Sequence, residues 1–179
     1  MGTSALKSTQ ITNLDATPVT PNTRGINAPG GVQLVDGYVT AVASDAAGST
    51  YKMVRVPSNA VVKRLTLASE AQGAGKINLS VYYSDSAVDG TQPSLQGIIV
   101  PTTGDQFFAS DVDLTSAVTP TDVTNESGNY TPDKRNKRLW DALGLTSDPG
   151  GFFDIVAVVH TTAITTGTGK IYLACEYIC

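Results

Sequence analysis

The clearest pattern in the chain is a series of short segments in which apolar and polar residues alternate. A period of two is typical of β-strands that bury one face. The best example is Lys76–Tyr83, where Ile77, Leu79, Val81 and Tyr83 share one face and Asn, Ser and Tyr residues occupy the other. The same reasoning predicts further strands over 38–42, 50–56, 61–67, 152–162 and 169–178.

Turn-forming residues separate these predicted strands. Gly, Ser, Asp and Asn gather at 44–49, 57–59 and 73–75, and a Thr- and Gly-rich turn lies at 165–168. Pro57 ends a strand because proline cannot donate to a β-ladder. Early strands, a long middle stretch and two closing strands predict an all-β fold, an antiparallel jelly-roll-like β-sandwich.

The middle stretch from residue 84 to 151 breaks the alternation and is expected to hold long loops. It predicts one short helix over 134–143, with Thr131 as N-cap, Pro132 in the first turn and Gly144 as the stop. A single helical turn is also expected over 105–109. The apolar stripe of the helix would consist of Leu139, Trp140 and Leu143.

The first 31 residues differ in composition from the rest of the chain. They are rich in Ser, Thr, Asn, Pro and Gly, and their apolar residues are isolated. Such a segment is either a disordered tail or an extended arm that lies on a neighbouring subunit. The isolated apolar residues favour the arm, so we divide the chain into an arm, 1–31, and a β-sandwich domain, 32–179. The expected contacts with a neighbouring subunit are Leu6, Ile11, Leu14, Val19 and Ile26.

Charge and composition narrow the possible functions. Charged residues make up 16% of the chain, whereas about a quarter is usual in globular proteins. The net charge is −4. Ser, Thr, Asn and Gly take the place of charged residues, which is typical of extracellular and virion proteins. Nucleic-acid binding is not expected, because it needs clustered Lys and Arg and the one basic cluster, 134–138, is short. No apolar run or leader pattern indicates a membrane partner, so we expect cytoplasmic synthesis.

Residues capable of chemistry are scattered. His160 has no His or Cys companion at ligand spacing and is expected to be structural or exposed. The segment 85–90 has some likeness to a calcium loop but lacks the terminal bidentate Glu, so an ordinary turn is expected. Asp111 and Asp113 are expected to be turn and capping residues. No catalytic, cofactor or metal site is predicted, and a hydrolase is the weakest alternative.

Cysteines and aromatic residues also have structural interpretations. Cys175 is expected in the core, and Cys179, roughly 13 Å farther along a strand, is too distant for a disulfide. Six aromatic residues could line a sugar-binding platform, but packing in the core or under loops is the simpler expectation. They are Tyr82, Phe107, Phe108, Trp140, Phe152 and Phe153.

Four segments, 51–63, 80–85, 104–110 and 149–156, together resemble virion structural proteins of tailed bacteriophages and prophages. Among these the chain is most similar to the small capsid decoration, or cement, proteins. The resemblance implies a jelly-roll-like sandwich that binds the major capsid protein outside an assembled head. It further implies a homotrimer on the virion surface that braces the shell, with no catalytic residues.

Two alternatives remain beside the decoration protein. A head-fibre or tail-associated phage protein would carry the same structural motifs. A carbohydrate-binding module would share the sandwich and use exposed aromatic side chains.

Overall fold

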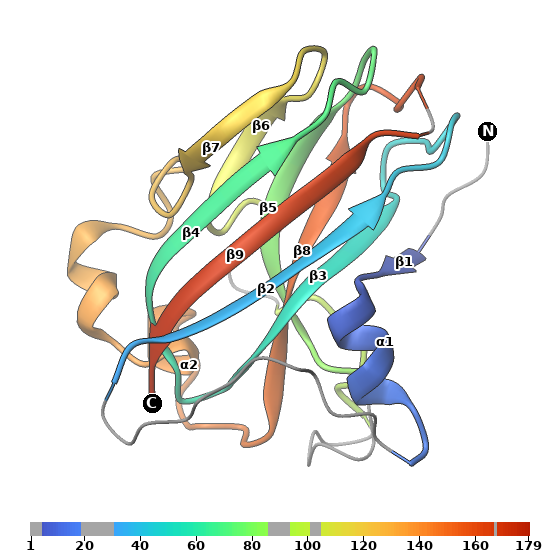
Figure 1. Ribbon diagram of the computed structural model, residues 1–179. Helices are drawn as coiled ribbons and strands as arrows, with labels where there is room; N and C mark the ends of the chain where they lie inside the picture. Colours follow the sequence, from blue (N-terminus) through green and yellow to red (C-terminus); the bar gives the residue numbers. More distant parts are fainter. Residues whose placement is uncertain (1–4, 19–30, 86–93, 101–104, 167) are drawn as a thin grey trace.

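In the computed structural model the chain forms a sandwich of two β-sheets (Figure 1). The structure describes residues 5–18, 31–85, 94–100, 105–166 and 168–179. The strands within them are β1 (Ala5–Lys7), β2 (Gln33–Thr40), β3 (Thr50–Pro57), β4 (Val61–Ser69), β5 (Lys76–Tyr83), β6 (Ala109–Asp113), β7 (Val118–Asp122), β8 (Phe152–His160) and β9 (Lys170–Ile178). The helices are α1 (Thr9–Asp15), the 3-10 helix η2 (Pro132–Asn136) and α2 (Leu139–Ala142).

The strand order identifies the sandwich as a jelly roll. One sheet has the order β1-β3-β8-β5-β6 and the other has the order β2-β9-β4-β7. Apart from β1, each described strand pairs antiparallel with its neighbours, and most connections cross from one sheet to the other. This arrangement confirms the all-β, jelly-roll-like sandwich predicted from the alternation.

The core lies between the two sheets. It takes the inward-facing side chains of the alternating strands, including Leu65, Leu67, Leu79 and Leu173, all fully buried. The other face of β5 is less exposed than its polar residues suggest. Asn78 is buried there because its side-chain amide donates to Asp105 Oδ2 at 3.1 Å and accepts from the Asp111 backbone N–H at 2.8 Å. The loop before β6 therefore covers part of this outer face.

The opposite sheet has an open outer face, visible at the front of Figure 1. On β2 the side chains alternate, so that Val35 and Val39 point inward while Leu34 and Tyr38 are about half exposed. The Tyr38 ring is partnered by Lys170, whose Nζ lies 5.6 Å from the ring centroid. The 3-10 helix η2 contacts β4 of this sheet, where Lys63 Nζ donates to Arg135 O at 2.9 Å.

The middle of the chain is more regular than its sequence suggested. It contains strands β6 and β7, which the alternation did not reveal. Each has only five residues, and β7 includes Pro120, which is tolerated because β7 lies at the edge of its sheet. The helical turn expected over 105–109 is wrong, because Phe107 and Phe108 lead directly into β6 as fully buried core residues.

The single helix expected over 134–143 is divided into η2 and α2. Lys137 and Arg138 between them have extended backbone, with ψ of 151° and 148°. The reason is tertiary: the Leu139 N–H donates to Ala60 O at 2.7 Å and the Trp140 N–H donates to Ser58 O at 3.2 Å. These N–H groups would otherwise have bonded to carbonyls one turn earlier in a continuous helix.

Residues 5–18 of the predicted arm contain a short strand and a helix. Here β1 pairs parallel with β3, and Ser8 caps α1 by accepting a hydrogen bond from the Ile11 N–H at 3.3 Å. Ile11 is fully buried within its own chain, and Leu6 packs partly buried against the core. This part of the chain therefore lies beside β2 and β3 (Figure 1), with its helix begun by the Ser8 cap.

We expect Gly37→Ala to destabilise the protein by about 1–3 kcal/mol, because an added Cβ has no space. That atom would lie 2.5 Å from Met53 O and 2.9 Å from Ser8 Oγ, where β2 meets β3 and the start of α1. Thermal denaturation measures the effect. Thr40→Ala on the exposed side of the same strand is the control, with an expected change within about 0.5 kcal/mol. Equal stability of the two variants would contradict this account of the contact.

Candidate functional site

The most unusual side chains in the sandwich are two opposite charges buried in adjacent strands. Arg55 of β3 and Asp154 of β8 face each other in register. The guanidinium donates from Nε to Oδ1 at 2.6 Å and from Nη2 to Oδ2 at 2.9 Å. Both side chains are almost completely buried, with 1% and 0% exposure. A bidentate pair of this kind has a defined orientation and compensates charges that would be costly to bury alone.

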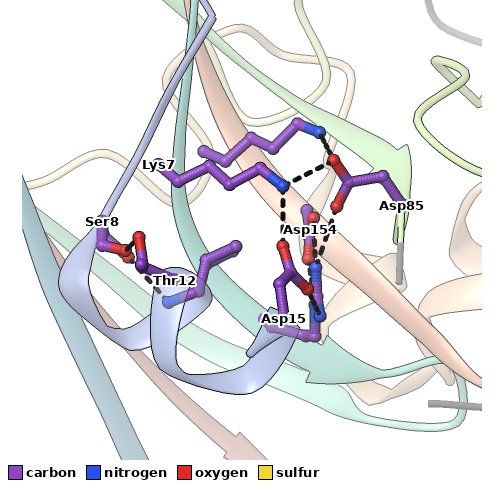
Figure 2. A network of polar contacts seen from close by, with 9 residues as sticks. Lys7, Ser8, Thr12, Asp15, Asp85 and Asp154 are labelled. Atoms are coloured by element: carbon purple, nitrogen blue, oxygen red, sulfur yellow. Dashed lines mark hydrogen bonds and ion pairs between the residues drawn. The ribbon is translucent and has the colours of Figure 1, made fainter. Parts of the chain in front are cut away.

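The N-terminal segment is attached to this pair through its own charges. Asp15, at the end of α1, accepts a hydrogen bond from Arg55 Nη1 at 2.6 Å and another from Lys7 Nζ at 2.8 Å. Lys7 is the last residue of β1, so the strand and the helix are also joined to each other. Figure 2 shows these side chains converging from β1, α1 and the sandwich.

Asp85, just after β5, completes the network. Its Oδ2 accepts from Lys52 and lies 3.0 Å from Lys7 Nζ, while its Oδ1 lies 3.3 Å from Arg55 Nη2. Among the described residues the network thus contains three cations and three carboxylates. They come from β1, α1, β3, β8 and the end of β5, so one polar cluster joins five parts of the fold.

The network shifts the pKa values of its members. Burial alone would raise the pKa of Asp85, but bonds from Lys52 and Lys7 outweigh it and lower the value to about 2. Burial opposes charge on Arg55, yet its bonds to Asp154 and Asp15 raise its pKa, so the guanidinium stays charged. Burial raises the pKa of the Asp154 carboxyl, and the Arg55 guanidinium opposes that rise.

Few of the residues singled out in the sequence belong to this cluster. Asp85, considered as part of a calcium loop, is occupied by protein cations, and residues 86–90 lie outside the described parts of the chain. His160 instead pairs with Asp111, with 2.7 Å between Nδ1 and Oδ1, on the surface. Asp113 Oδ1 accepts from the Thr115 N–H at 2.8 Å, which is the capping role expected of it.

The aromatic and cysteine expectations can also be placed. Phe107, Phe108 and Tyr130 form a fully buried group of edge-to-face rings. Phe153 is buried as well, whereas Trp140 is only partly buried against the core. Cys175 is buried and Cys179 exposed, and both are free thiols.

The five contact residues expected in the predicted arm, 1–31, differ in their surroundings. Ile11 and Leu6 pack inside their own chain, Leu14 is half-buried on α1, and Val19 and Ile26 lie outside the described residues. Their contact with a capsid or sister subunit stays a prediction.

The pairing of Arg55 with Asp154 was not among the predictions from the sequence. The available signal was a charge within otherwise apolar strands, in the segments YKMVRVP and FFDIVAVVH. Opposite charges at such positions indicate a buried pair, because either one alone would be unfavourable there. What sequence could not indicate was that β3 and β8, some hundred residues apart, are neighbours in the sheet.

The geometry of the network is suited to holding segments together. All three of its carboxylates are committed to protein cations, and within the described parts of the chain no group of three or more His, Cys, Asp or Glu residues could hold a metal ion. In the same residues, no helix has the length and apolar character needed to cross a membrane.

Comparisons with known proteins give a fold relationship. No family model and no curated protein matches the sequence. The structure is similar to a chain from the capsid of Ralstonia phage GP4, with a TM-score of 0.62 and 15% identity, covering 98% of this chain and 97% of that one. A chain from the cyanophage Pam1 capsid asymmetric unit has a TM-score of 0.39 and 17% identity, covering 90% of this chain and 94% of that one. The first match shows that the two chains share a fold over nearly their full length.

We expect Arg55→Met to lower the free energy of unfolding by about 3–5 kcal/mol, because Asp154 would stay buried without its partner. Chemical denaturation followed by circular dichroism measures the change. Arg64→Met is a matched control: Arg64 is half exposed and its Nε lies 3.6 Å from Asp122 Oδ2. Its expected cost is below about 1 kcal/mol. Equal costs at the two positions would show that the Arg55 pair is not the critical contact.

The lowered pKa of the Asp85 carboxyl predicts that the stability of the fold depends on pH. Its pKa is lowered to about 2 in the folded chain, so its ionised form stabilises the fold above the ordinary carboxyl pKa near 4, by about 2 kcal/mol. That contribution should disappear as the pH falls from about 4 to about 2. Unfolding of wild type and Asp85→Asn at pH 6 and pH 2.5 tests this. A stability difference between them that does not shrink on acidification would contradict it.

Proposed function

We propose that this chain is a non-enzymatic virion structural protein that binds the outside of an assembled phage capsid and stabilises it, as a decoration or cement protein. The observation that carries the proposal is the end-to-end similarity to a chain from the capsid of Ralstonia phage GP4. The match covers 98% of this chain and 97% of that chain, so the likeness extends over nearly the full length of both. The sequence resemblance to decoration proteins points in the same direction.

The interior of the protein supports a structural role. The buried charges form a balanced network, and its carboxylates bond to Lys and Arg side chains. Reactive groups outside it are separate: the Cys175 thiol is buried, and burial raises its pKa. A protein that braces a shell needs a rigid body and partner surfaces, and the jelly roll with its charge network provides the first.

The expected partners are the major capsid protein and further copies of this chain, arranged as a homotrimer on the capsid surface after synthesis in the host cytoplasm. Closed symmetric assemblies are the usual form of homo-oligomers. The proposed contact residues remain those of the N-terminal segment. Val19, Ile26 and Leu14 are the useful ones to test, since Ile11 is already buried within its own chain.

The alternatives differ in how well the structure supports them. A carbohydrate-binding module would present aromatic rings to solvent, whereas Phe107, Phe108 and Phe153, which could have lined such a platform, are fully buried. A head-fibre or tail-associated protein would fit the same fold. Binding to capsids in place of tails separates a decoration protein from a tail-associated one.

The direct test is co-sedimentation of the purified protein with phage heads that lack it, after its mass has been measured by light scattering. We expect a trimer that saturates the heads and raises the temperature at which they release DNA. Binding to isolated tails in place of heads would favour the tail-associated alternative, and binding to neither would remove the proposal.

The contact residues are tested in the same assay with Val19→Asp and Ile26→Asp combined. We expect capsid affinity to fall by about tenfold or more, since removing buried apolar contacts from an interface costs about 1–2 kcal/mol or more. Unchanged thermal stability would show that the fold is intact. The control is Thr121→Asp on the exposed face of β7, which should bind like wild type if the N-terminal residues are the contacts.

A further inference from the structure

The N-terminal segment, residues 5–16, packs on the sandwich as a separate unit. Its strand and helix contact mainly β3 and β2. The hydrophobic core formed between the two sheets begins at Val35 and is complete without a residue of this segment, although Leu6 packs against it. Ile11 is the segment's buried apolar anchor. The jelly roll therefore closes its core on its own, and the segment occupies a site on its edge.

The charge network divides along the same boundary. Lys7 and Asp15 belong to the segment and pair with each other at 2.8 Å. The sandwich contributes the other four charges, Lys52, Arg55, Asp85 and Asp154. Without the segment, Arg55 would still pair with Asp154 and Asp85, and Lys52 would still pair with Asp85. Each part contains equal numbers of positive and negative charges. Separating the segment from the sandwich thus leaves no buried charge without a partner, which is the usual obstacle to breaking a buried ion network.

From this division we propose that the edge of β3 is a docking site that also accepts the β1–α1 segment of a second copy of this chain. Three features define the site. The β3 edge provides backbone hydrogen bonds, as in Ser8 N–H to Lys52 O at 2.7 Å. A buried position receives Ile11, and Arg55 and Asp85 receive Asp15 and Lys7. Addition of a strand to a sheet edge with side-chain specificity is a common mode of peptide recognition.

A second copy is the occupant because its segment is the one sequence shown by this structure to fit. The charges are directional: a cation at position 7 faces Asp85 and an anion at position 15 faces Arg55. Residues 17–32 connect the segment to β2, and sixteen residues can span at most about 55 Å, which is enough to reach an adjacent molecule. When copies are closely packed, the local concentration of neighbouring segments rises, and these segments compete with the chain's own segment for the site. The inference applies to the isolated protein and does not depend on capsid binding.

The experiment uses the full chain carrying the charge swap Lys7→Glu with Asp15→Lys. The net charge of the chain is unchanged, and the two substituted residues can still form an ion pair with each other. Each now faces a like charge, because a carboxylate at position 7 meets Asp85 and an ammonium group at position 15 meets Arg55. The chain's own segment should therefore leave, while every residue of the docking site stays native. The probe is a fluorescent peptide with the wild-type sequence of residues 5–18, and its binding is measured by anisotropy. Thermal denaturation checks that the swapped chain remains folded.

We expect the wild-type peptide to bind the swapped chain at least about tenfold more tightly than a peptide carrying the same swap, and more tightly than it binds the wild-type chain, whose site is filled. Equal binding of the two peptides, or no binding, would overturn the proposal. Unfolding of the swapped chain would also overturn it, because the segment would then be part of the folding unit.

Discussion

The bidentate pair between Arg55 and Asp154 is the interaction around which the polar part of this protein is organised. Two fully buried charges on neighbouring strands are tolerated only when their geometry is satisfied, because each is strongly unfavourable alone. The pair therefore requires β3 and β8 to lie side by side in one register. It also directs guanidinium Nη1 toward Asp15, and Nη2 is shared between Asp154 and Asp85. The attachment of α1 and the position of the chain after β5 both follow from that direction.

The two sheets of the jelly roll have different surroundings as a result. The five-stranded sheet carries the charge network, the N-terminal segment and the loop that covers Asn78. The four-stranded sheet leaves β2, β9 and β4 with an open outer face (Figure 1). A jelly roll by itself does not define a function, since the same architecture serves shells, lectins and enzymes. What distinguishes this chain is therefore the chemistry of its two faces and its carboxylates, which are paired with protein cations as Asp85 is with Lys52.

The sequence by itself determined the strands that alternate strongly. It predicted β3, β4, β5, β8 and β9 to within about two residues, because the period of two is a local property. It also determined the fold class. The short strands β6 and β7 were missed, since five residues with polar or proline positions carry little periodic signal.

Only the tertiary structure decided the rest. Whether residues 132–142 form one helix or two depends on carbonyl groups of Ser58 and Ala60, which the local sequence does not contain. The folding back of residues 5–18 depends on Arg55 and Asp85, distant in sequence and brought together by the sheet order. Alternation records which side of a strand meets the core. It does not record which strands are neighbours, and pairing between neighbours is what gives a buried charge its partner.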